Sequence, residues 1–240
     1  RKNNKELNIM MNVKDYEMFA DYCEKVLQID PARKDPNDHF YKSLPLCAMD
    51  AVFSIGVRYS TVEKTTSAYI EHFGLSIPRD VTPSKEHTTS DFLDNIKKSP
   101  SIEHFAEGVL HNKQRTSSRN GILKAEACRQ IAEILRKHAV ETLSDFIHYS
   151  DRDSLDKEIL AVKGQSSGIM LRYLYMLAGE KNLIKPDRHV ERFIRSQFPK
   201  ATTQQDLQDM ISNAATILKK TYPEMTPRFL DCLIWEYQRK

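Results

Sequence analysis

The sequence predicts an all-α protein. Apolar residues recur at intervals of three and four along most of the 240-residue chain, which is the spacing of one helix face. No stretch alternates apolar and polar residues with the period of two that is typical of a half-buried strand, and no internal repeat is present. With 40% hydrophobic residues, the chain can bury the core of one large domain or two small ones.

The N-terminal quarter of the chain predicts three helices. Apolar residues at helical spacing mark the first over residues 16–27, and a proline-containing loop follows over residues 30–39. Residues 44–55 are apolar on nearly all sides, as in a buried helix. Val57–Val62 has the β-branched composition of a strand but has no partner strand, so we interpret it as a turn and the start of a helix that ends at Gly74.

The rest of the chain continues this pattern. Residues 76–90 are rich in Pro, Ser, Thr and charge and predict a surface connection. The later apolar stripes that predict helices cover residues 92–96, 105–110, 127–135, 143–147, 207–218 and 229–237.

Composition excludes several classes of protein. There is no apolar run of eighteen residues or more and no signal-peptide pattern, so we expect an intracellular protein, cytoplasmic or nuclear, without a membrane partner. The four cysteines lie far apart in the sequence, without a Cys-x-x-Cys pair, so we expect neither a metal site nor a cofactor.

A net charge of +3, from 36 basic and 33 acidic residues, is too small for a nucleic-acid-binding tail. Any DNA affinity must therefore come from local patches of charge. The most basic segment carries Lys113, Arg115, Arg119, Lys124, Arg129, Arg136 and Lys137. This pattern fits a solvated helix face as well as it fits a DNA-binding surface.

The stretch from Leu155 to Ile194 has the only spacing that indicates chemistry as well as packing. Gly164 supplies a turn position after a short helix, and Ser166 or Ser167 can cap the helix that follows. The exposed amides of such a turn and the positive end of the helix suit a phosphate. About twenty residues later, Asp187 follows a proline at the expected start of another helix.

These segments resemble the signature of the helix-hairpin-helix DNA glycosylase superfamily, which includes endonuclease III. Leu160–Gly164 stands for the family's Leu-Pro-Gly-Val-Gly hairpin, and Pro186–Val190 stands for its segment of an aspartate, a histidine and an apolar residue. The sequence departs from the pattern at Ala161 and Val162, where the family has Pro-Gly, and at Ser166, where bifunctional members carry lysine.

The resemblance implies a fold of two helical lobes with the cleft between them. It assigns residues 62–180 to a six-helix barrel that ends in the hairpin, and residues 1–61 with 181–240 to a second lobe built from both chain ends. It also implies that the iron-sulfur cluster of several relatives is absent, because only Cys232 lies in the corresponding region.

The resemblance further implies a monomer whose partner is double-stranded DNA that contains an altered base. Asp187 is the expected catalytic residue, with His189 in a structural role, and Arg58 and Tyr59 are the candidates for a wedge that fills the space of an extruded base. The expected phosphate-binding residues of the hairpin are Lys163, Gly164, Gln165, Ser166, Ser167 and Gly168.

The function that the resemblance implies is hydrolysis of an N-glycosidic bond, in base excision repair or in removal of modified bases from foreign DNA. Ser166 cannot form a Schiff base, so we expect a monofunctional enzyme, with Lys185 as the most credible substitute amine. Two alternatives remain open at this point, a non-catalytic DNA-binding module and a helical adaptor that binds protein.

Overall fold

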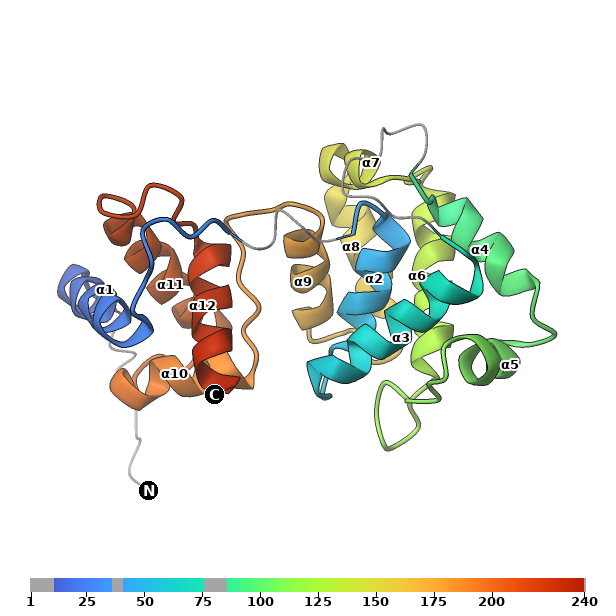
Figure 1. Ribbon diagram of the computed structural model, residues 1–240, viewed down its shortest axis with the longest axis horizontal. Coiled ribbons are helices and arrows are strands. Elements are labelled where there is room, and N and C mark those ends of the chain that lie inside the picture. Colours follow the sequence, from blue (N-terminus) through green and yellow to red (C-terminus); the bar gives the residue numbers. More distant parts are fainter. Residues whose placement is uncertain (1–10, 36–40, 76–85, 240) are drawn as a thin grey trace, which may run out of the picture. The chain divides into compact units, whose positions relative to one another are not determined.

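A computed structural model describes residues 11–35, 41–75 and 86–239, and within these ranges the chain is helical and forms no strand, as the sequence predicts (Figure 1). The described helices are α1 (Val13–Leu27), α2 (Leu44–Phe53), α3 (Tyr59–His72), α4 (Thr89–Lys97), α5 (Ile102–His104), the π-helix η3 (Phe105–Val109), α6 (Lys124–Lys137), α7 (Leu143–His148), α8 (Arg152–Ala161), α9 (Ile169–Leu177), α10 (Arg188–Gln197), α11 (Gln204–Leu218) and α12 (Pro227–Arg239).

The contacts of the chain divide it into two compact units. Unit 1 comprises Arg1–Pro36 with Lys181–Lys240, and unit 2 comprises Asn37–Glu180. Of the residues that the expected division placed with the chain ends, 41–61 lie in unit 2. The physical reason is that α2 packs against α3, α6 and α9 and is the buried centre of that unit.

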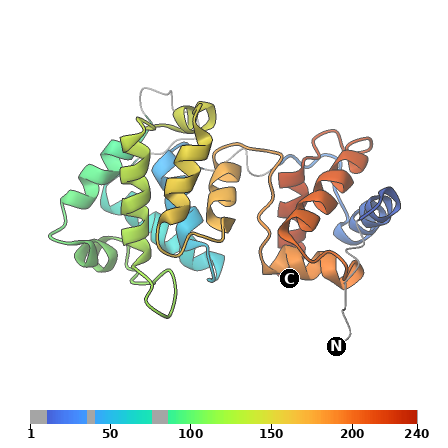
Figure 2. The same cartoon turned by 180° about the vertical axis from the view of Figure 1, so that it is seen from behind.

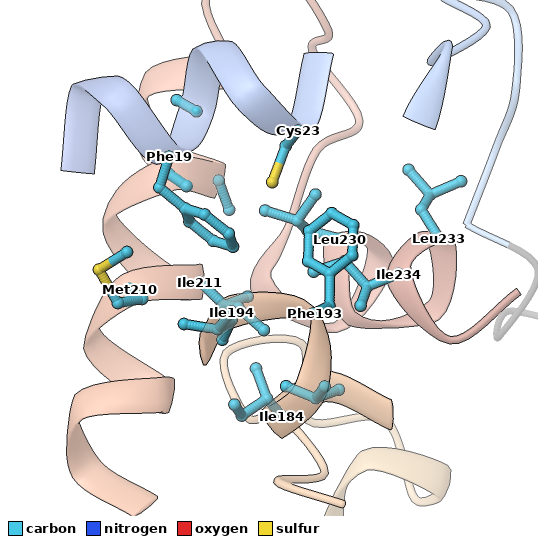
Figure 3. Close-up of a cluster of buried hydrophobic side chains, with 14 of the residues drawn as sticks. Phe19, Cys23, Ile184, Phe193, Ile194, Met210, Ile211, Leu230, Leu233 and Ile234 are labelled. Atoms are coloured by element: carbon cyan, nitrogen blue, oxygen red, sulfur yellow. The ribbon is translucent and has the colours of Figure 1, made fainter. Parts of the chain in front are cut away.

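Unit 1 is held together by an apolar core to which α1, α10, α11 and α12 each contribute (Figure 3). Phe19 of α1 is fully buried and packs edge-on against Phe193 of α10, with 6.1 Å between ring centroids. Ile211 of α11 and Leu230 of α12 close the same cluster. Chain segments nearly two hundred residues apart therefore share one core, and burial of each large side chain contributes about 2 kcal/mol.

Unit 2 is organised around α2, whose ten residues are all buried, with α3, α4, α6 and α9 packed against it (Figures 1 and 2). This explains the nearly continuous apolar composition of residues 44–55. The one carboxylate of α2, Asp50, is buried and accepts hydrogen bonds from the hydroxyl groups of Tyr41 and Tyr59, at 3.2 Å each. A buried charge needs such donors to be tolerated.

The predicted helix boundaries hold in the places where capping signals are clear. Val57–Val62 is a turn followed by the start of α3, and the chain leaves α3 through Gly74 at φ +59°. The helix α4 begins with a capping box, in which Thr88 accepts from the backbone of Asp91 and Asp91 accepts from that of Thr88. Most of the expected surface connection over residues 76–90 lies outside the described residues.

Candidate functional site

The hairpin of unit 2 joins α8 to α9 through residues 162–168. Gly164 has φ +92° and Gly168 has φ +75°, which are conformations that residues with a β-carbon rarely adopt. The two glycines therefore set the path of the turn. The sequence predicted this role for Gly164, and the positive φ confirms it.

The predicted serine cap is wrong. The residue that precedes α9 is Gly168, and no side chain caps this helix. Ser166 and Ser167 lie before the cap position, and both are exposed. The physical reason is that the tight turn continues through Gly168, so the first helical residue is Ile169.

Several amides of this turn remain available to a ligand. The N–H of Gln165 donates to the carbonyl of Val162 at 3.0 Å. In the described chain, by contrast, the N–H groups of Gly164, Ser166 and Ser167 donate no hydrogen bond. Together with the positive end of α9, these donors form the kind of surface that binds an anion.

The side chains around this turn differ in access. Lys163 is exposed beside the open amides, whereas the side chain of Gln165 is buried, with 3% of the residue exposed. Gln165 was expected to contact phosphate. Its side chain is instead buried in unit 2, and its Oε1 atom has no hydrogen-bond partner among the described residues.

The hairpin packs tightly against the loop that precedes α6. A β-carbon built on Gly164 would lie 2.4 Å from the β-carbon of Thr116 and 2.6 Å from its hydroxyl oxygen. Contacts under 3 Å require something to shift. Gly164 is therefore needed for close packing as well as for its backbone conformation.

The two wedge candidates differ in exposure. Arg58 is exposed and immediately precedes α3. Tyr59 is half-buried, and its hydroxyl group donates to Asp50 in the interior of unit 2. Burial, reinforced by the nearby charge of Asp50, raises the pKa of Tyr59. Arg58 is therefore the candidate whose side chain is free to reach a ligand.

The basic segment over residues 113–137 presents fewer free charges than its sequence suggests. Lys124 is buried, and its ammonium group donates to the carbonyl oxygens of Phe53 at 3.0 Å and Ile55 at 2.8 Å. It binds the end of α2 and is not available to DNA. Arg129 pairs with Glu126 and Glu133 on its own helix.

Ion pairs also engage both ends of this segment. Lys113 pairs with Glu107, and Lys137 pairs with Glu158. Arg119 and Arg136 are exposed and take part in no ion pair in the described part of the chain. The segment is therefore a weaker candidate for a DNA-binding surface than the hairpin.

Asp187 of unit 1 is the residue that immediately precedes α10. Its Oδ1 atom accepts hydrogen bonds from the backbone N–H groups of His189 at 2.8 Å and Val190 at 3.3 Å. Among the described residues, no donor reaches Oδ2, and the side chain is only partly buried. The hydrogen bonds to Oδ1 thus fix the orientation of the side chain, while Oδ2 stays free to contact a ligand.

His189 lies beside this carboxylate but is not suited to carry a proton. Burial lowers its pKa, and the neighbouring cations of Arg188 and Arg192 lower it further, although the charge of Asp187 opposes this effect. A neutral imidazole at neutral pH agrees with the expected structural role of His189.

Asp231 is a candidate that the sequence pattern did not reveal. It lies on α12 with 6% of the residue exposed, and its Oδ1 atom has no hydrogen-bond partner among the described residues. Burial raises the pKa of Asp231 well above its usual range, and the charge of Asp187 raises it further; nearby Lys185 opposes both effects. The one signal in the sequence was a carboxylate three residues before Ile234, on the buried face of an amphipathic helix.

The described residues hold no group of three or more His, Cys, Asp or Glu side chains that could bind a metal ion. All four cysteines are free thiols. Within the same part of the chain, no helix is both long enough and apolar enough to cross a membrane.

A family model described as a domain of unknown function (DUF8548) matches residues 17–239. The comparisons with curated proteins and with solved structures found no match.

Proposed function

The chain belongs to the DUF8548 family, and we propose that it is a monofunctional DNA glycosylase that hydrolyses the N-glycosidic bond of an altered base in duplex DNA. The observation that carries the proposal is Asp187, whose carboxylate is fixed by two backbone amides through Oδ1 and keeps Oδ2 free. A hairpin with open amides around Gly164 precedes it in the chain, in the order that the glycosylase signature requires.

The chemistry follows from the charge that develops when a nucleoside C–N bond breaks. The sugar acquires positive charge as in an oxocarbenium ion, and a fixed carboxylate stabilises that charge. A water oxygen bonds to C1′ while the C1′–N bond breaks with its electron pair on the base. Asp187 accepts the proton that the water loses and then passes it to the departing nitrogen of the base, so the carboxylate is regenerated. The product is an abasic site.

The hairpin supplies the sequence-independent part of binding. The free N–H groups of Gly164, Ser166 and Ser167 and the ammonium group of Lys163 suit one DNA phosphate. Arg58 is the residue that we assign to the space left by the extruded base, because its side chain is exposed.

Strand cleavage by β-elimination requires an amine that attacks the sugar. The position at which bifunctional relatives carry lysine is Ser166, and its hydroxyl group cannot form an imine. Lys185 is the nearest substitute in sequence to Asp187, but its charge acts on the buried carboxyl of Asp231. We therefore expect an abasic product with an intact strand.

The test is excision from a panel of duplexes, each of which carries one altered base. The parent should release one class of base, with strand cleavage only after alkali and without a covalent adduct under borohydride. Asp187→Asn should still cap α10 but should lose the stabilising charge, which lowers the rate by about 10² to 10³. A parent that excises nothing, or a folded Asp187→Asn that excises at the parent rate, would contradict the proposal.

Asp151→Asn is the matched control, because Asp151 caps α8 through the same kind of side-chain hydrogen bond, in this case from the N–H of Ser154. It should leave excision unchanged. A non-catalytic DNA-binding module would bind unmodified duplex with strong salt dependence but release no base, and a protein-binding adaptor would do neither.

A further inference from the structure

The loop over residues 111–123, which leads into α6, is ordered by its own hydrogen bonds. The N–H of Thr116 on one side donates to the carbonyl of Ile122 on the other at 2.9 Å. The base of the loop is tied to α3, because the side-chain amide of Asn112 donates to the hydroxyl group of Thr65 at 2.9 Å. The loop projects from the end of unit 2 at which α6 begins (Figures 1 and 2).

The tip of this loop comprises residues 117–120, all of which are exposed. Two hydrogen bonds close the tip. The hydroxyl group of Ser117 donates to the carbonyl of Arg119 at 2.7 Å, and the guanidinium group of Arg115 donates to the carbonyl of Gly121 at 2.6 Å. A β-carbon on Gly121 would collide with the backbone of Ser117, so the two sides of the tip approach each other closely. A tip that is ordered in this way can bind a partner without a large loss of conformational entropy.

The loop lies against the hairpin that we assign to a DNA phosphate. Thr116 occupies the space that a β-carbon on Gly164 would need. Arg119 follows Thr116 by three residues, which span at most about 10 Å. One strand of duplex DNA carries a charge about every 3.4 Å along the helix axis. A strand that is bound at the hairpin therefore has further phosphates within reach of the tip.

The tip has the charge and the donors that a DNA backbone requires. Residues 112–124 contain four basic residues and no acidic residue. Lys113 and Lys124 are engaged within the protein, whereas Arg119 is exposed and takes part in no ion pair among the residues that the structure describes. The other tip residues are two serines and an asparagine, whose side chains are of the kinds that donate to phosphate oxygens in protein–DNA complexes.

We propose that the tip at residues 117–120 is a second contact to the DNA backbone, in which Arg119 binds a phosphate beside the one that the hairpin holds. This inference rests on the proposed function, because it takes duplex DNA as the partner. It adds a loop that the glycosylase signature does not include, and it distinguishes Arg119 from the rest of the basic segment over residues 113–137.

The test is fluorescence anisotropy with unmodified duplex over a range of salt concentrations. Loss of one phosphate contact should reduce the slope of log affinity against log salt by about 0.9, and it should lower the affinity about eightfold at about 0.1 M salt. Arg119→Ala should show both changes, and to the same extent on duplexes of different sequence. Arg119→Lys keeps the charge and should retain the slope of the parent.

Arg136→Ala is the matched control. Arg136 is an exposed arginine without an ion pair in the described chain, and it lies near the C-terminal end of α6, about 18 Å along the helix from Lys124. Its substitution removes the same charge but should leave the salt slope at the parent value. If Arg119→Ala keeps the affinity and slope of the parent, or if Arg136→Ala changes both as much as Arg119→Ala does, the inference is overturned.

The failure of this inference and the failure of the proposed glycosylase can be told apart. A parent that binds duplex through Arg119 but excises no base would refute the glycosylase and leave the DNA contact in place. Excision by the parent, together with an unchanged affinity in Arg119→Ala, would refute only the contact at the tip. A parent without affinity for duplex would refute both.

Discussion

The raised pKa of Asp231 has a direct consequence for stability. In the folded chain, burial and the charge of Asp187 raise the pKa of Asp231 well above its usual range. In the unfolded chain, the same side chain releases its proton at a pKa of about 3.9. At any pH between these two values, the folded state therefore holds one proton that the unfolded state has lost.

The sign of the effect follows from this difference. A group whose pKa is raised on folding contributes stability that is complete below the unfolded pKa and is lost as the pH rises toward the folded pKa. The loss is about 1.4 kcal/mol per pH unit for one proton. Asp231→Asn does not titrate, so the variant should gain stability relative to the parent as the pH rises from 5 to 7, by up to about 1.4 kcal/mol per pH unit.

Urea unfolding of the parent and the variant at both pH values measures this gain. The difference between the two proteins cancels the titration of every group that they share, apart from groups coupled to Asp231. Asp153→Asn, at an exposed site, should show no such change with pH. If the gain were independent of pH, or decreased as the pH rose, Asp231 would be ionised in the folded chain and the reasoning would be refuted.

Two further predictions concern residues whose roles in unit 2 are packing roles. Lys124→Met removes the two hydrogen bonds that the buried ammonium group donates to the end of α2. In urea unfolding, the variant should lose about 2–4 kcal/mol of the free energy of unfolding. Its DNA affinity, measured by fluorescence anisotropy, should be unchanged. Gly164→Ala places a β-carbon 2.4 Å from the β-carbon of Thr116, at a residue with φ +92°. Gly74→Ala is the control, because its φ is also positive but no atom lies within 4 Å of the added β-carbon. Gly164→Ala should therefore lower the free energy of unfolding by about 1–3 kcal/mol more than Gly74→Ala does. Equal costs in these two glycine variants would show that the Thr116 contact is not a constraint.

The sequence by itself determined the features that depend on neighbours along the chain. Apolar spacing predicted an all-helical protein, and the described residues confirm it. Gly164 was predicted to have a positive φ, and Asp187 was predicted at a helix start; both are local properties of turns and caps. Such properties are readable because the interacting groups lie within a few residues of one another.

The tertiary structure alone decided which polar side chains meet. Lys124 belongs to a basic run, yet its ammonium group binds carbonyls about seventy residues earlier in the chain. Tyr59 bonds to Asp50 in the interior, although the resemblance made it a candidate for the wedge. Asp231 comes close to Asp187 only because α12 packs against α10. Helical periodicity specifies which face of a helix is buried but not which helix covers it, and contacts of this kind depend on that second choice.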